Sequence, residues 1–202
     1  MAKPILIFLF LLSLFNACKN SEVIEKKNAQ GIVTERIQLA GDTSEGKNGV
    51  YEYFTETGLP KEIVNYKNGK IHGERKLYEN GFLYSIENLN QGLFEGEYKV
   101  FYPTGKLKVE GQYTSNVTSG IWKGYYASGQ LKEEVNMADN EENGPFTEYY
   151  ENGAIKVKGS YLHGTNEHGE LLMYDSTGAL ERKMDCLEGI CKTTWKRENT
   201  SN

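Results

Sequence analysis

Pairs of glycines recur along the chain at a nearly constant spacing, and this repeat limits the fold more than any other feature. The first glycine of each pair, here called the opening glycine, recurs every 23 to 25 residues, at Gly49, Gly73, Gly96, Gly120, Gly144 and Gly169. The second, here called the turn glycine, follows eight residues later in the second unit and nine residues later in the others, at Gly58, Gly81, Gly105, Gly129, Gly153 and Gly178. Such a period is typical of repeat proteins, so we expect about six copies of one unit of about 24 residues over positions 49–190.

Each unit has the pattern of an antiparallel β-hairpin. The turn glycine ends a short turn sequence such as ETG, PTG or ASG. A three-residue hairpin loop needs a left-handed residue at its last position, which glycine supplies without a side-chain penalty. In the unit that opens at Gly96 we expect strands at 97–102 and 106–113. Apolar residues two and eight positions after the turn glycine, here Leu107 and Tyr113, then share one face of the second strand.

A single hairpin of this kind cannot bury its apolar face, whereas stacked hairpins cover one another. The sequence therefore predicts an all-β fold of tandem β-hairpins in one stack. Aromatic residues recur on the first strand of the units, and they are candidates either for packing between hairpins or for binding a partner: Tyr98, Tyr102, Trp122, Tyr126, Phe146 and Tyr150. We expect packing for Trp122 and exposure for some of the tyrosines.

The segments YYENGAIKVKG, FYPTGKLKVEG and NYKNGKIHGERKLYENG resemble the bacterial variant of the MORN repeat. The resemblance extends from Gly49 to about Gly189. It implies β-hairpins stacked into an elongated, curved sheet, contacts with other proteins and sometimes with membrane lipids, and no catalytic residues. Many bacterial proteins of this type carry the label of YwqK-like antitoxins.

The chain begins with MAKPILIFLFLLSLFNAC, in which Lys3 precedes an apolar run at 4–15. The run is too short to span a bilayer and has the form of a secretory signal peptide. Its end at Ala17-Cys18 resembles a bacterial lipoprotein signal. We therefore expect a signal peptide at 1–17 and a lipidated Cys18, with the protein exported and held at the periplasmic or surface side of the cell envelope. The alternative is ordinary secretion with a spare cysteine.

The segments before and after the repeats are predicted to be a tether and a C-terminal tail. Residues 18–48 are polar and are expected to form a tether, with a candidate capping strand at 32–39. In CLEGIC, Cys186 and Cys191 flank a turn, and cysteines of an exported protein can oxidise. Facing positions in a hairpin bring two cysteines within bonding distance, so we expect a disulfide that closes the last hairpin, with two free thiols as the alternative. Residues 191–202 are expected to form a C-terminal tail.

The sequence holds no phosphate-binding loop and no nucleophile elbow. Its histidines, at His72, His163 and His168, are few and scattered, and the acidic run at 138–143 lacks the spacing of a calcium loop. A net charge of −5 argues mildly against nucleic acid as a partner. We therefore expect a non-enzymatic, membrane-anchored scaffold that binds an unidentified protein, with no cofactor, metal or small-molecule substrate. The alternative is an antitoxin or immunity protein that neutralises a toxin.

Overall fold

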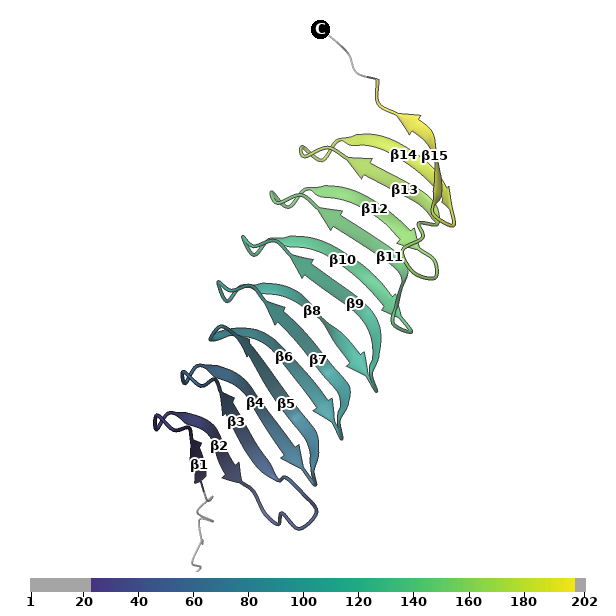
Figure 1. Ribbon diagram of the computed structural model, residues 1–202. Coiled ribbons are helices and arrows are strands. Elements are labelled where there is room, and N and C mark those ends of the chain that lie inside the picture. Colours follow the sequence, from purple (N-terminus) through teal and green to yellow (C-terminus); the bar gives the residue numbers. More distant parts are fainter. Residues whose placement is uncertain (1–22, 199–202) are drawn as a thin grey trace, which may run out of the picture.

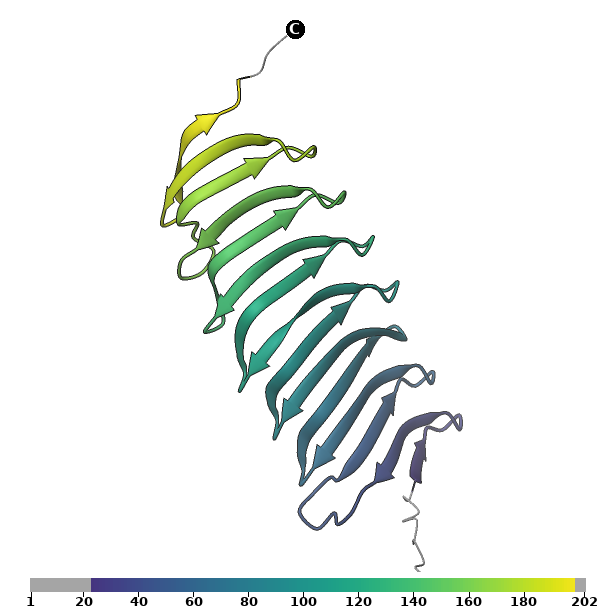
Figure 2. The ribbon, with the colours of Figure 1, turned by 180° about the vertical axis from the view of Figure 1, so that it is seen from behind.

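The computed structural model describes residues 23–198, which form one antiparallel sheet of 15 strands. Each strand pairs with its neighbours in the chain, so the sheet is an open series of hairpins and does not close (Figure 1). β1 and β15 lie at opposite ends of an elongated, curved stack, which Figure 2 shows from behind. This confirms the predicted all-β fold of tandem hairpins.

The strands are β1 (Val23–Lys27), β2 (Val33–Leu39), β3 (Gly49–Phe54), β4 (Pro60–Lys67), β5 (Lys70–Glu79), β6 (Phe82–Asn90), β7 (Leu93–Phe101), β8 (Leu107–Thr114), β9 (Val117–Tyr125), β10 (Leu131–Ala138), β11 (Glu141–Tyr149), β12 (Ile155–Tyr161), β13 (Gly169–Tyr174), β14 (Leu180–Leu187) and β15 (Ile190–Lys196). The six units of the sequence correspond to the hairpins from β3–β4 to β13–β14. The structure adds a hairpin, β1–β2, before them and a strand, β15, after them.

The turn glycines adopt the left-handed conformation that the sequence predicts. In the β9–β10 hairpin the amide of Tyr126 donates to the oxygen of Gln130, and the amide of Gly129 donates back to the oxygen of Tyr126 at 2.8 Å. Gly129 has φ +94°, so the three-residue loop with glycine at its end is confirmed. The β5–β6 hairpin differs, because Glu79 pairs directly with Phe82 across a two-residue turn. This shorter turn accounts for the one-residue deletion in the second unit.

The sequence suggested that each opening glycine begins a hairpin, which holds for Gly49 and Gly169 at the start of β3 and β13, whereas the other four opening glycines lie inside their strands. β7 starts three residues before Gly96, after a separate two-residue turn at Gln91 and Gly92 with φ of +53° and +87°. Gly96 lies inside β7 with φ +98°, where the pairing with β6 shifts register. The side-chain amide of Asn88 donates to the oxygen of Glu97 at 2.9 Å across this bulge. A glycine marks a left-handed residue in either setting, so its position alone does not separate a bulge from a turn.

The two ends of the sheet differ from their sequence predictions. β2 (Val33–Leu39) occupies the candidate capping position at 32–39, but β1 (Val23–Lys27) is a strand within the predicted tether. β15 (Ile190–Lys196) extends the ladder into the predicted C-terminal tail at 191–202. Backbone hydrogen bonds hold these edge strands, and they do not require the apolar period on which the sequence interpretation relied. No helix within residues 23–198 has the length and apolar character needed to cross a membrane.

The core is a layer of side chains on one face of the sheet, here called the packed face. One buried cluster consists of Ile37, Tyr51 and Val64, and a second consists of Phe146, Val157, Leu171 and Cys186. Residues that face each other on neighbouring strands form a row along the packed face. The first stretch of this row consists of Tyr51, Val64, Arg75, Glu87 and Tyr98, and the second consists of Trp122, Val135 and Phe146. Since cross-strand neighbours on one face stabilise a sheet by contact, the hairpins depend on one another along this row.

Candidate interaction surface

The aromatic residues two positions after the opening glycines pack against their neighbours in the stack. The rings of Tyr98 and Trp122 have centroids 5.8 Å apart, and Tyr113 lies 5.5 Å from the first ring and 5.3 Å from the second. Trp122 also covers Gly111, where any side chain would collide with the indole. Phe146 is 6% exposed and stacks on Tyr161 with centroids 4.2 Å apart. These contacts place Tyr98, Trp122 and Phe146 on the packed face.

The tyrosines six positions after the opening glycines connect one hairpin with the next. The hydroxyl of Tyr102 donates to the backbone oxygen of Tyr125 at 2.7 Å. The hydroxyls of Tyr126 and Tyr150 make the equivalent bonds, to the oxygens of Tyr149 at 2.7 Å and Tyr174 at 2.9 Å. We call these three residues the tyrosine ladder. Their rings are half-buried between successive turns, so they belong to the structure of the stack as much as to its surface.

A further aromatic series, which the sequence interpretation missed, lies five positions after the opening glycines: Phe54, Tyr78, Phe101, Tyr125, Tyr149 and Tyr174. The hydroxyl of Tyr125 donates to Oε1 of Glu110 at 2.6 Å, and that of Tyr149 donates to Oε2 of Glu134 at 3.2 Å. Burial, and then the hydrogen bond to Glu110, raise the pKa of Tyr125 to about 12. Paired aromatic residues, such as the two tyrosines of YYENG, indicate this series in the sequence. The sequence interpretation rested on residues at even offsets from the opening glycine, whereas this series lies at an odd offset.

An ionic cluster interrupts the aromatic row in the second unit, where Arg75 takes the aromatic position. Its Nε lies 2.7 Å from Oε1 of Glu62 on β4, and its Nη1 lies 3.5 Å from Oε2 of Glu87 on β6. Glu87 is 6% exposed and accepts a hydrogen bond from the hydroxyl of Ser85, which is fully buried. A buried carboxylate needs such partners. Ion pairs therefore connect β4, β5 and β6 at this position, whereas contacts between aromatic rings connect the strands of the next units.

Cys186 and Cys191 are joined by a disulfide in the structure. The two residues face each other directly on β14 and β15, with Cα atoms 4.0 Å apart. Cys186 is 3% exposed and packs in the cluster that contains Phe146 and Leu171. The bond therefore attaches the last strand to the core. Cys18 and the signal peptide at 1–17 lie outside the described residues.

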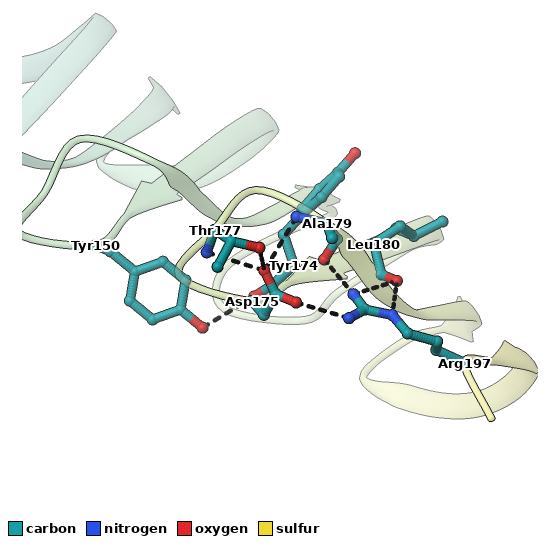
Figure 3. A network of polar contacts seen from close by, with 7 residues as sticks. All are labelled: Tyr150, Tyr174, Asp175, Thr177, Ala179, Leu180 and Arg197. Carbon is teal, nitrogen blue, oxygen red and sulfur yellow. Dashed lines mark hydrogen bonds and ion pairs between the residues drawn. The ribbon is translucent and has the colours of Figure 1, made fainter. Parts of the chain in front are cut away.

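Arg197 closes the C-terminal end of the stack (Figure 3). Its Nη1 lies 2.7 Å from Oδ2 of Asp175, and its remaining donors reach the backbone oxygens of Ala179 at 2.6 Å and Leu180 at 2.9 Å. The other oxygen of Asp175 accepts from the hydroxyl and amide of Thr177 within the turn. The Thr177 hydroxyl, and then Arg197, hold the pKa of Asp175 well below its ordinary value. Residue 197 was assigned to the tail from the sequence, yet it caps the last turn.

A shallow hollow of about 320 Å³ lies between the turn of the β5–β6 hairpin and that of the β7–β8 hairpin. Its walls are mainly aromatic or apolar and come from Phe82, Leu83, Tyr84, Phe101, Tyr102 and Pro103, with Glu79, Asn80 and Lys108 completing the lining. Phe82 and Tyr84 are 56% and 42% exposed. Within residues 23–198, no three His, Cys, Asp or Glu side chains are grouped so that they could hold a metal ion.

An open, single-layer sheet of sequential hairpins, each bonded to the next, defines a tandem β-hairpin repeat protein. Four segments match the family model described as MORN repeat variant, at residues 47–68, 94–114, 119–139 and 142–163. Over these four segments the chain is similar to proteins of that family. The β5–β6 hairpin, which has the shorter turn and Arg75, and the β13–β14 hairpin lie outside the matched segments. The comparison with curated proteins gave no match.

Proposed function

We propose that this chain is a non-enzymatic scaffold that binds another protein, and that a lipid on Cys18 holds it at the bacterial cell envelope. The repeat family supports a scaffold role, and the sequence around Ala17-Cys18 supports the anchor. An antitoxin that binds and neutralises a toxin would be a special case of such a scaffold. This alternative stays a prediction from the sequence.

The observation that carries the proposal is the group of exposed rings around the hollow between the β5–β6 and β7–β8 hairpins. Phe82 and Tyr84 are 56% and 42% exposed, and they line the hollow together with Leu83, Phe101 and Tyr102. Removing apolar surface from water is favourable, so exposed rings favour contact with a partner. Single exposed apolar residues are ordinary, whereas several rings on one concave surface are typical of binding sites. Aromatic residues also lose little conformational entropy on binding, which suits recognition of a protein.

The remaining polar groups support a structural use of this sheet. The ion pairs of Arg75 and Arg197 and the hydroxyls of the tyrosine ladder all connect neighbouring strands or turns. The ion pairs join side chains to each other, and the tyrosine hydroxyls donate to backbone oxygens. Within residues 23–198 these groups are not gathered around a cleft where a substrate would react. This supports binding as the activity.

The proposal is tested by cross-linking the full chain in its native membrane and identifying the captured proteins by mass spectrometry. We expect one partner to be recovered with the wild-type chain. Phe82→Ser should reduce its recovery several-fold, whereas Ile121→Ser should not, although Ile121 is just as exposed, at 60%. Equal recovery with both variants would remove the exposed rings as the binding surface.

The anchor is tested separately by fractionating cells that express Cys18→Ser. A multiply acylated cysteine holds a protein firmly in a bilayer, so the variant should move from the membrane fraction to the soluble fraction. The matched control is Ser21→Ala, which leaves the cysteine in place. If Cys18→Ser stays in the membrane as fully as the wild-type chain, the lipid anchor is wrong.

A further inference from the structure

In three places the gap between successive hairpin turns is filled by a ring of the tyrosine ladder. Tyr102 illustrates the arrangement, because its hydroxyl donates to the oxygen of Tyr125 in the next hairpin. The Nζ of Lys108 lies over the face of the Tyr102 ring, 5.8 Å from its centroid. Tyr126 and Tyr150 repeat the hydrogen bond one and two hairpins further on. A phenol is thus the group that this repeat uses to fill the gap and to satisfy the facing carbonyl.

The ends of the stack use other groups for the same purpose. After the last unit, the guanidinium of Arg197 occupies the turn and donates to the oxygens of Ala179 and Leu180, as Figure 3 shows. Between the first two units, the side chain of Leu59 lies against the turn at Gly81, where an added Cβ would be 3.4 Å from it. The chain therefore closes these gaps with side chains of its own.

The gap between the β5–β6 and β7–β8 hairpins has no such ring within the described part of the chain. The position equivalent to Tyr102, six residues after the opening glycine, is Glu79, and the turn that follows is one residue shorter than its neighbours. The hollow of about 320 Å³ lies at this place. Such a volume is at the lower end of the range of about 300–1,000 Å³ seen for ligand pockets, so it suits a single side chain.

The lining of the hollow corresponds to the surroundings of Tyr102, one unit earlier in the chain. Tyr84 lies three residues after its turn glycine, just as Lys108 lies three residues after Gly105. In the hollow, Tyr84 therefore occupies the position that Lys108 has next to the Tyr102 ring. Phe101 stands five residues after its opening glycine, as Tyr125 does, so its carbonyl is the counterpart of the one that accepts the Tyr102 hydroxyl. The hollow is thus the ladder position from which the phenol is missing.

We infer that this hollow receives a tyrosine side chain from an extended segment of the partner protein. The ring lies between Tyr84 and Tyr102, and its hydroxyl donates to the backbone oxygen of Phe101. Residues 1–22 and 199–202 contain no tyrosine that could fill the hollow. The inference rests on the proposed scaffold function and specifies the chemistry of what the scaffold binds.

The inference is tested with N-acetyltyrosinamide as a probe and N-acetylphenylalaninamide as its matched control. The full chain from Cys18 onward is labelled with ¹⁵N, and amide shifts are followed during titration. We expect saturable shifts at Phe82, Leu83, Tyr84, Phe101 and Tyr102. Loss of one neutral hydrogen bond should make the phenylalanine probe bind about fivefold more weakly.

Two variants locate the site. Tyr84→Ala removes one wall of the hollow at an exposed position and should abolish the saturable shifts, whereas Trp195→Ala, an exposed aromatic on β15, should leave them unchanged. No saturable shift, equal binding of the two probes, or unchanged binding to Tyr84→Ala would each overturn the inference. Cross-linking distinguishes this from a failure of the scaffold function, because a partner captured equally by Tyr84→Ala would keep the scaffold and reject only the tyrosine site.

Discussion

The hydroxyl of Tyr126 donates a hydrogen bond of 2.7 Å to the backbone oxygen of Tyr149, which lies 23 residues later, at the end of the first strand of the next hairpin. The separation nearly equals the repeat period, so the bond joins one unit to the next and does not stabilise the hairpin from which it comes. Repeat proteins owe their stability to such nearest-neighbour terms as well as to the individual units. The tyrosine ladder therefore reports on the coupling between hairpins.

Tyr126→Phe should destabilise the protein by about 1 kcal/mol, because it removes this hydrogen bond and keeps the ring. Urea denaturation followed by circular dichroism measures the change. Tyr84→Phe is the matched control, since Tyr84 is 42% exposed, and its effect should stay below about 0.5 kcal/mol. Equal losses in the two variants would show that the ladder bond contributes no coupling.

Trp122→Ala should cost about 3 kcal/mol, the low end for loss of a tryptophan from a packed site, because the ring is half-buried between Tyr98 and Tyr113. Gly111→Ala should also destabilise the protein, since its new methyl group would collide with the same indole. Thermal unfolding measures both. Ile121→Ala is the control on the same strand, 60% exposed and expected to change little. An unchanged melting temperature for Trp122→Ala would place the indole on a binding face instead.

We expect the disulfide between Cys186 and Cys191 to be present in the isolated protein. Alkylation under denaturing conditions followed by intact-mass measurement should label neither cysteine before reduction and both after it. Replacing both residues by alanine should lower the stability by about 2 kcal/mol, since the closed loop is short and the gain from closing it is small. Two thiols that are alkylated without a reductant would contradict the prediction.

The stability should fall as the pH rises from about 10 to 12, partly through Tyr125. Its pKa in the folded protein is about 12, against about 10 for an unperturbed tyrosine, so the folded state binds this proton more tightly. The stabilisation is complete below about pH 10 and is lost as the pH approaches the folded pKa. Urea midpoints measured across this range should fall less steeply in Tyr125→Phe and in Glu110→Gln, which removes the acceptor's charge. Identical slopes in all three proteins would show that Tyr125 is not responsible.

The repeat, the hairpin unit and the turn at Gly129 could all be predicted from the amino-acid sequence. Each depends on the conformation of single residues or on the alternation of neighbours along one strand. A left-handed φ favours glycine wherever it occurs, and an even offset places Leu107 and Tyr113 on one face in any β-strand. Local rules of this kind need no knowledge of which strand lies alongside. The choice between packing and binding for the aromatic residues stayed open, because it depends on the neighbouring hairpin.

Only the tertiary structure decided how one hairpin meets the next. The register between β6 and β7 makes Gly96 a bulge, and the same kind of alignment brings the Tyr102 hydroxyl to the oxygen of Tyr125. The tertiary structure also places the edge strand β1 within the expected tether and most of the edge strand β15 within the expected tail. Arg197 lies against the last turn. These contacts join positions in different hairpins, and their geometry depends on the register between strands, which the residues of a single strand do not specify. The sequence by itself therefore determined the repeating unit, and the tertiary structure determined which of its rings hold the stack together and where a gap between hairpins was left unfilled.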